Sequence, residues 1–343
     1  MITYILRRLN LLLLTLLILA LASYWLVHAF PGDPVANLSG VSFITAEQKA
    51  YLDQYYHTDK SFLNQFIRYL ELLWLGDWGK SFVSGQPLVD EIATFLPASI
   101  ELGTYALILS LLFGIPLGFW AGIKHGKVSD YSILSFSLLG YSVPVFWLAL
   151  LLILFFSLQL GWLPISGRIS LLYDIPQETG FIVYDILASN IENKYEALVN
   201  AASHMLLPTI SISIVTSTII MKMTRHSVIE VLSSDYIRAA YAKGLTSRQV
   251  LLKHGLRNAL LPIVPQVAMQ FTTLLTNAMI VETIFSWPGV GNWLIQAIYQ
   301  EDYPAIRAGM LAVSVLVVVF TVFIDLTHKV FDPKRMHHRR VKN

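Results

Sequence analysis

The chain has 343 residues, of which 55% are hydrophobic and only 13% are charged, with a formal net charge of +2. A soluble domain averages roughly 45–50% apolar and roughly 25% charged residues, so this composition excludes a soluble enzyme and a disordered chain. The sequence contains no cysteine, which excludes a disulfide framework, a thiolate nucleophile and a metal site built on cysteine.

Six apolar runs are long enough to cross a bilayer as helices, since a span needs about 20 apolar residues at 1.5 Å per residue. The third run contains Pro144, which a membrane helix tolerates where neighbouring helices satisfy the freed carbonyl group. The sequence therefore predicts an all-α integral membrane protein that forms a single membrane domain over residues 1–343. The predicted spans are residues 9–30, 98–122, 131–160, 205–223, 262–285 and 310–330.

The basic residues between the spans predict the orientation of the chain. The segments that face one side of the membrane hold 17 Lys and Arg residues, and those on the other side hold 7. Because basic residues accumulate in cytoplasmic segments, we expect both termini in the cytoplasm. The 31–97 segment is then a periplasmic loop, and residues 331–343 are a cytoplasmic tail.

The first apolar run has a second interpretation. Arg7 and Arg8, followed by apolar residues 9–19 and the small-residue triplet at residues 20–22, also resemble a cleavable signal peptide. Hydrophobicity continues to Phe30, which favours a membrane span. Cleavage would leave five spans in the same orientation.

Two connecting segments are predicted to contain short helices. In the 31–97 loop, apolar residues recur at helical spacing between Leu63 and Leu73, which indicates an amphipathic helix.

The segment at residues 230–261 is predicted to form two short cytoplasmic helices. The first can begin at Ser234 or Asp235, whose side chains are suited to capping, and can end at Gly244. The second is expected from Ser247 to Asn258.

The chain lacks the motifs of an ATPase and of a hydrolase. Gly79-Lys80-Ser81 has the end of a phosphate-binding loop, but residue 74, where that motif needs glycine, is tryptophan. Neither H-E-x-x-H nor G-x-S-x-G occurs. We therefore expect no catalytic residue, no metal and no organic cofactor in this chain.

A stand-alone proton-coupled carrier is the alternative from a different functional class. Such a carrier needs acidic residues deep in its spans. The candidates Glu101, Glu282 and Asp325 lie near predicted span ends, which favours an interface role over a proton relay.

Polar residues form a stripe along one face of the fourth predicted span and another along the fifth, at spacings of three and four residues. Because polar groups are costly in lipid, each stripe should face protein or water. Two interpretations stay open: the stripes pack helices together through hydrogen bonds, or they line a translocation pathway. The candidate residues are Thr209, Ser213 and Thr216 in the fourth span, and Gln266, Gln270, Thr273 and Asn277 in the fifth.

A ridge of glycines runs along the second predicted span. Gly114, Gly118, Gly122 and Gly126 recur every four residues, so they share one helix face and permit the close approach of another helix. That helix can belong to this chain or to a partner subunit.

The segment Asp235–Pro262 resembles the coupling-loop signature of the permeases of binding-protein-dependent ABC importers. That signature is Glu-Ala-Ala, three residues, Gly and a later Leu-Pro; Ala239-Ala240 and Gly244 match it, while Leu261-Pro262 comes later than in the general pattern. Arg238 stands at the Glu position, as is usual in the dipeptide/oligopeptide branch. Further matches to the first, B-type, permease of that branch are Tyr4–Arg8, Pro31–Pro34, Ser142–Trp147 and Glu282–Gly291, so the resemblance covers nearly the whole chain.

This resemblance implies a type I ABC importer permease with six transmembrane helices and a cytoplasmic coupling helix between spans four and five. The expected partners are a second, homologous permease that completes a heterodimer, two cytoplasmic ABC ATPase subunits and a periplasmic solute-binding protein, with membrane lipid around the spans and no nucleic acid. The complex would lie in the bacterial cell inner membrane, and the ATPase subunits would hydrolyse ATP. The residues that would contact or support the ATPase are Asp235, Tyr236, Ala239, Ala240, Lys243 and Gly244.

The resemblance also implies a class of substrate. Short motifs, among them the turn Leu160–Arg168, look most like the B permeases of Sap systems, a group named for sensitivity to antimicrobial peptides and linked to putrescine export. We therefore expect transport of di- or oligopeptides or of antimicrobial peptides, with polyamine (putrescine) transport or export as the alternative.

Overall fold

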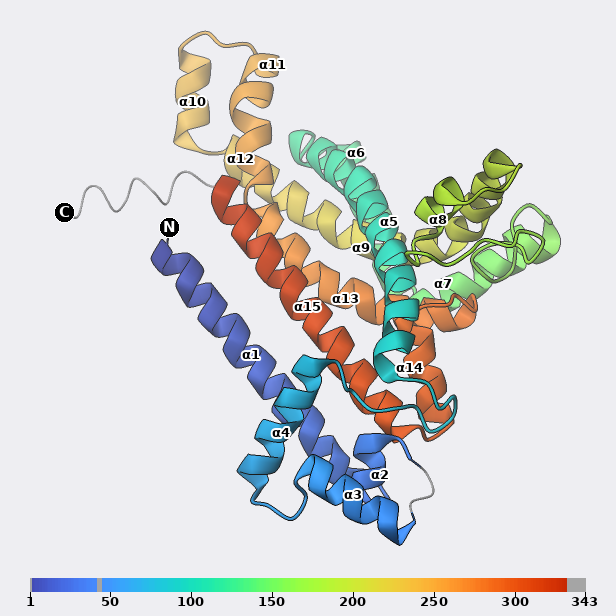
Figure 1. The fold of residues 1–343 in the computed structure, drawn as a ribbon. Coiled ribbons are helices and arrows are strands. Elements are labelled where there is room, and N and C mark those ends of the chain that lie inside the picture. The colour runs from blue at the N-terminus through green and yellow to red at the C-terminus, as the bar shows by residue number, and fades with distance from the viewer. Residues whose placement is uncertain (1, 42–44, 332–343) are drawn as a thin grey trace. The chain divides into compact units, whose positions relative to one another are not determined.

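The computed structural model describes residues 2–41 and 45–331, so the predicted cytoplasmic tail beyond Phe331 lies outside the described residues. Within these ranges the regular structure is helical, apart from one isolated β-bridge between Lys80 and Pro87. The predicted all-α class is therefore confirmed. The helices, drawn in Figure 1, are α1 (Ile2–Ala29), α2 (Pro34–Ser39), α3 (Ala46–Tyr56), α4 (Phe62–Leu75), α5 (Leu88–Ile123), α6 (Val128–Ser142), α7 (Val145–Leu152), the π-helical η1 (Ile153–Gln159), α8 (Ile182–Ala188), α9 (Lys194–Leu232), α10 (Asp235–Ala242), α11 (Ser247–Val250), the π-helical η2 (Leu251–Gly255), α12 (Leu256–Leu260), α13 (Ile263–Ile284), α14 (Val290–Tyr299) and α15 (Tyr303–Phe331).

Five helices in the described part of the chain are long and apolar enough to cross a membrane, namely α1, α5, α9, α13 and α15. Each overlaps one of the predicted spans, and α5, α9 and α15 extend beyond the predicted bounds. The remaining candidate is a pair, α6 followed by α7 with its extension η1, and the two members are bent by 95° relative to each other. The described residues thus provide five candidate spans, or six when the bent pair counts as one.

The bend replaces the continuous helix that we expected over residues 131–160. Helix α6 ends at Ser142, Val143 has an extended backbone (φ −88°, ψ 120°), and Pro144 precedes the first residue of α7. A residue before proline is disfavoured in the helical conformation, because the proline ring crowds its backbone. Pro144 therefore separates two helices instead of lying within one.

The 31–97 loop contains the predicted amphipathic helix as α4, and two further short helices, α2 and α3, precede it. Asp33 caps α2, since its carboxylate accepts the backbone N–H of Val35 at 2.9 Å. The same carboxylate accepts a hydrogen bond from the Lys49 ammonium group. The bond from Lys49, and after it the bond from Val35, holds the pKa of Asp33 below its ordinary value.

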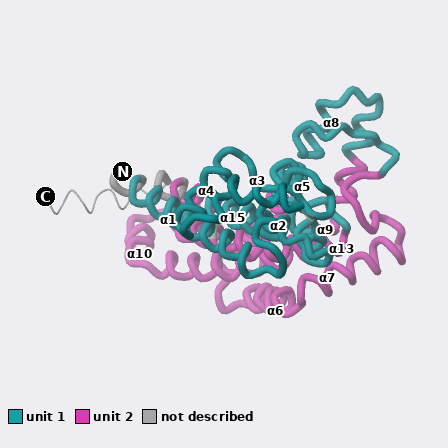
Figure 2. Tube along the Cα trace, turned by 60° about the horizontal axis from the view of Figure 1, so that its bottom comes forward, with its two compact units in different colours: residues 1–100, 171–198, 286–319 teal, residues 101–170, 199–285, 320–343 magenta. Residues whose placement is uncertain are grey.

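The chain divides into two compact units, each assembled from separated stretches of sequence (Figure 2). Unit 1 comprises the described residues of Met1–Ile100, Leu171–Leu198 and Ser286–Val319. Unit 2 comprises those of Glu101–Ser170, Val199–Phe285 and Phe320–Asn343. The single membrane domain expected from the sequence stays a prediction.

In unit 1, the 31–97 loop packs against the C-terminal half of α1. Tyr24 of α1 is 1% exposed, and its hydroxyl donates to Gln65 Oε1 of α4 at 2.6 Å. The hydroxyls of Ser23 and Tyr69 are hydrogen-bonded at 2.9 Å. The buried apolar cluster at this contact is Ala20, Tyr24, Val27, Val35, Leu38, Tyr56, Phe66, Tyr69 and Leu72.

Two buried charges, Asp302 and Arg307, attach the same loop to the beginning of α15. The Asp302 carboxylate accepts hydrogen bonds from the Ser81 hydroxyl and from the backbone N–H groups of residues 82 and 83. The Arg307 guanidinium donates to the carbonyl oxygen of Trp78 at 2.6 Å and lies over the ring of Tyr69, 5.4 Å from its centroid. Both residues are only 2% exposed, so their charged groups have lost most of their contact with water. The hydrogen-bond partners in the loop replace that water.

In unit 2, the glycine ridge of α5 packs against α9. A Cβ atom at Gly118 would lie 2.4 Å from the carbonyl oxygen of Met221, and one at Gly122 would lie 2.6 Å from the Cβ of Val228. Such distances are shorter than any van der Waals contact, so only glycine permits this approach. Gly126 has open space around it and takes no part. The ridge therefore serves a contact within the chain.

Replacing Gly118 by leucine should prevent α5 and α9 from packing. Overpacking costs about 1–3 kcal/mol where the core can adjust, and here the obstruction is backbone. We expect the variant to be lost from the membrane or to melt at a lower temperature in detergent. Thr104→Leu places the same side chain at an exposed position of α5 and should melt like the wild type. Equal melting temperatures for both variants would show that the ridge contact is not required.

Candidate functional site

The segment between α9 and α13 folds as a small helical hairpin, which we call the coupling hairpin (residues 233–261). Helices α10 and α11 enclose an apolar centre of Ile237, Ala240 and Val250, which are 1%, 7% and 0% exposed. Val231 and Leu245 pack against this centre. The hairpin therefore has a core of its own, although it is short.

The turn of the hairpin depends on Gly244. Its φ of +81° lies in the left-handed region, which glycine adopts without a steric penalty. The N–H of Gly244 donates to the carbonyl of Tyr241, and the N–H of Leu245 donates to that of Ala240. These two bonds form a Schellman motif, which ends a helix by satisfying its last carbonyl groups. A side chain at Gly244 would meet open space, so the backbone conformation is what requires glycine.

The predicted ATPase-contacting residues separate into two groups. Ala240 belongs to the centre of the hairpin, where it supports α10. The other five, Asp235, Tyr236, Ala239, Lys243 and Gly244, are exposed. The predicted capping of α10 by a side chain of Ser234 or Asp235 is not observed, because the Ser234 hydroxyl donates to the carbonyl of Val231 instead.

The hairpin is joined to a candidate span at each end. Helix α9 runs without interruption to Leu232, and only residues 233 and 234 separate it from α10. On the other side, the predicted helix Ser247–Asn258 is present as α11, η2 and α12, which lead into α13. The Ser227 hydroxyl of α9 donates to the carbonyl of Ala259 in α12 at 2.7 Å. Movement of the hairpin would therefore be transmitted to α9 and to α13.

The polar stripe of α9 is buried inside the chain. Thr209, Ser213 and Thr216 are 9%, 3% and 2% exposed. The hydroxyls of Ser213 and Thr216 donate to carbonyl groups of their own helix, those of Ile210 and Ile212. The burial agrees with helix packing, but these hydroxyls bond within α9 and not between helices, so the predicted packing through interhelical hydrogen bonds stays a prediction.

The side chains of the polar stripe on α13 are more exposed than those on α9. Thr273 is exposed, and Gln266, Gln270 and Asn277 are partly exposed. Amide and hydroxyl groups within a membrane span need protein or water as hydrogen-bond partners. The two stripes that looked equivalent in the sequence therefore differ, and only the α13 stripe is available to a pathway or to another subunit.

A buried ionic cluster in unit 2 was not predicted. Asp130, at the start of α6, has a fully buried side chain, and Arg225 of α9 donates to both of its oxygens, at 2.6 and 2.8 Å. The backbone N–H of Gly126 donates to it at 3.0 Å, and His125 Nδ1 lies 3.1 Å away. The two charged residues are separated by 95 positions, and no local pattern connects them.

A second buried ion pair concerns one of the candidate proton-relay residues. Glu101 of α5 accepts a hydrogen bond from Arg168, and their side chains are 4% and 7% exposed. Glu282 is also buried, at 1% exposure. The Glu101 carboxylate is already bound by a guanidinium within the protein, which favours a structural role for Glu101 over a proton relay.

The chain resembles known proteins over nearly its whole length. The family model described as "Binding-protein-dependent transport system inner membrane component" matches residues 114–337, and the model of the corresponding N-terminal region matches residues 1–103. The di/tripeptide transport system permease protein DppB of Pseudomonas aeruginosa is 38% identical over 339 residues, which cover 99% of this chain and 100% of the relative. The peptide transport system permease protein SapB of Salmonella typhimurium and the putrescine export system permease protein SapB of Escherichia coli are each 40% identical over 333 residues, 97% of both chains.

The chain therefore belongs to the family of binding-protein-dependent transport system inner membrane components, the multi-pass permeases of ABC transporters. The family predicted from the coupling-loop signature is confirmed, as is its dipeptide and Sap-type branch.

The Asp130–Arg225 pair should contribute strongly to stability. Removing one partner of a buried ion pair leaves an uncompensated charge and costs about 3–5 kcal/mol. We expect Asp130→Ala to lower the melting temperature of the detergent-solubilised chain by several degrees. Asp235→Ala breaks the exposed Asp235–Arg238 pair and should leave that temperature unchanged. If the two variants melt alike, the buried pair is not a structural link.

Proposed function

We propose that this chain is the permease subunit of an ABC transporter that moves peptides across the bacterial inner membrane, with ATP hydrolysed by separate subunits. The family membership and the peptide-transport names of similar relatives support this substrate class. The chain supplies the pathway and transmits movement, forms and breaks no covalent bond, and binds no metal or organic cofactor.

The observation that carries the proposal is the construction of the coupling hairpin. It has a buried apolar centre, five of its six predicted contact residues are exposed, and both of its ends continue into candidate spans. A rigid projection of this kind suits docking to an ATPase subunit on the cytoplasmic side. The excess of basic residues on that side supports cytoplasmic termini.

The uncovered polar face of α13 supports a pathway shared with a second permease. A heterodimer would place this face opposite a similar subunit, so its amides and hydroxyls would contact the cargo or water. A periplasmic solute-binding protein would deliver the peptide. Neutral hydrogen-bonding groups suit peptide backbones, which carry one donor and one acceptor at most residues.

Putrescine transport is the second candidate, because one similar relative is named for putrescine export. A route for a dication would favour carboxylates along the pathway, since opposite charges attract most strongly where water is scarce. The α13 stripe carries amides and hydroxyls instead, which favours peptides.

Gly244→Trp should abolish ATPase association and transport while the protein stays in the membrane, because tryptophan disfavours the left-handed turn and adds bulk to the docking surface. Pull-down of the tagged chain with mass spectrometry should recover a second permease and two ATPases from the wild type only. Gly76→Trp is the matched control, since Gly76 ends α4 with a φ of +83° in open space.

The outcome for the control decides how the result is interpreted. If Gly76→Trp also loses the ATPases, the defect reports general misfolding. If Gly244→Trp transports normally at normal expression, the coupling role is refuted.

Asn277→Leu should change peptide uptake without weakening ATPase association, because it removes an amide from the α13 stripe far from the coupling hairpin. The exposed Thr272 is at neither three nor four positions from any residue of the stripe, so Thr272→Val should leave uptake unchanged. Uptake of labelled peptide by whole cells measures both. Failure of Asn277→Leu to assemble would instead show that the stripe serves packing.

A further inference from the structure

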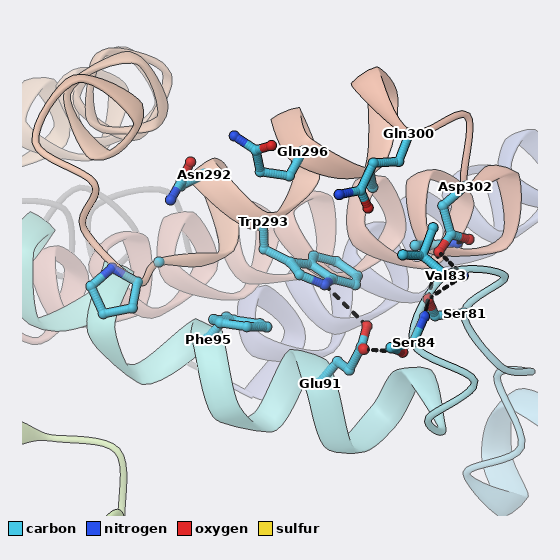
Figure 3. A pocket seen from close by; sticks show the side chains of 14 residues that line it. Ser81, Val83, Ser84, Glu91, Phe95, Asn292, Trp293, Gln296, Gln300 and Asp302 are labelled. Carbon is cyan, nitrogen blue, oxygen red and sulfur yellow. Dashed lines mark hydrogen bonds between the residues drawn. The ribbon is translucent and has the colours of Figure 1, made fainter.

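Unit 1 contains a cavity whose lining includes no residue of the coupling hairpin or of the polar stripes. It has a volume of about 290 Å³ and lies among the first turns of α5, the turn at residues 81–84 and helix α14 (Figure 3). Ligand sites for small molecules begin at roughly 300 Å³, so the cavity has room for a small group or for the end of a chain. α14 and the 81–84 turn lie outside the candidate spans, and the predicted orientation places them on the periplasmic side.

Glu91 is held in place at one wall of this cavity. Trp293 Nε1 donates to Glu91 Oε2 at 3.0 Å, and the Ser84 hydroxyl donates to Glu91 Oε1. Figure 3 shows these bonds on the two sides of the carboxylate. An ionised carboxylate has about four acceptor sites, so Glu91 keeps capacity for a further donor. Its geometry is fixed before any ligand arrives.

Aromatic rings lie beside this carboxylate. Phe95 and Trp293 are stacked, with centroids 6.1 Å apart and ring planes inclined by 23°. The face of an aromatic ring attracts a cation, and tryptophan does so most strongly. A carboxylate next to an aromatic face is a combination that suits a positively charged group.

The charged residues that line the cavity also favour a cationic ligand. Its lining contains two acidic residues, Glu91 and Asp302, and no lysine or arginine. Asp302 already accepts bonds from Ser81 and from backbone N–H groups on the loop. Glu91 is therefore the carboxylate with spare capacity, and a cation is the ligand that it favours.

Amide side chains line the wall opposite Glu91. Gln296 and Gln300 are exposed and lie four positions apart, so they share one face of α14 and its end. A side-chain amide offers both a carbonyl acceptor and N–H donors. This wall matches the N–H and C=O groups of a peptide backbone, whereas a diamine has no carbonyl to offer.

We propose that this cavity binds the amino-terminal ammonium group of a peptide substrate on the periplasmic side, with Glu91 as the charge partner and the α14 amides facing the first peptide bonds. The assignment rests on the proposed peptide transport and names a part of the substrate that the permease itself recognises. The shared chemistry is a primary ammonium group, which a peptide terminus and a diamine both carry.

The test is calorimetric titration of the full chain in lipid nanodiscs with trialanine, N-acetyl-trialanine and putrescine. Trialanine should bind, and N-acetylation, which removes the charge, should weaken binding about tenfold or more, as expected for loss of a charge-assisted hydrogen bond. Glu91→Gln should cause a similar loss for trialanine, and Gln296→Ala a loss of severalfold.

Two variants serve as matched controls. Glu71→Gln removes an exposed carboxylate on α4, and Ile298→Ala shortens an exposed side chain on α14 outside the cavity lining. Both should bind trialanine like the wild type. Glu91→Gln should melt within a degree of the wild type, because glutamine retains an oxygen that can accept from Trp293.

Each other outcome overturns the proposal. Equal binding of trialanine and its N-acetyl form would exclude recognition of the ammonium group. Tighter, Glu91-dependent binding of putrescine would assign the cavity to a diamine. No heat with any probe would exclude a substrate site in this cavity. If the assembled transporter still takes up trialanine in that case, the proposed function stands while this inference fails; if it does not, both fail.

Discussion

The contact between α5 and α9 is the one on which the rest of unit 2 depends. In a bilayer, helices gain little by hiding apolar side chains from lipid, so close packing of small residues supplies much of the attraction. Gly114, Gly118 and Gly122 allow α9 to approach the backbone of α5 directly. Once α9 is placed, Arg225 reaches Asp130, and Ser227 reaches Ala259. The coupling hairpin then takes its position from a helix that is itself fixed.

In unit 1, two buried charged residues fix the arrangement of the 31–97 loop. Asp302 and Arg307 are five residues apart at the start of α15, and both bind the backbone of the 31–97 loop. A buried charge without partners is very costly, so these bonds admit few alternative arrangements of the loop. The turn at residues 81–84 is held by Asp302, and this turn forms one edge of the cavity that contains Glu91. The shape of that cavity is thus a consequence of the same anchoring.

Most of the fold and part of the candidate site could be predicted because their signals are local. The five long spans are visible as apolar runs, and Gly244 is visible as a helix end followed by a new helix. The effect of Pro144 was misjudged, because whether a proline bends a helix or ends it depends on the groups available to its neighbours. The polar stripes of α13 and α9 have the same kind of spacing in the sequence. They differ in how deeply their side chains are buried, because burial depends on which helix packs against each stripe.

Local sequence was sufficient for the class of protein, the order of its helices and the position of its coupling hairpin, because each of these follows from residues within a few turns of one another. Tertiary structure alone decided which helix the glycine ridge meets, which polar stripe is covered, and that Glu91 and Trp293, 202 positions apart, meet in one cavity. Such contacts join residues that are far apart in the chain, so no local pattern in the sequence predicts them. Their physical basis is the close packing and the pairing of buried charges that appear only when the helices come together.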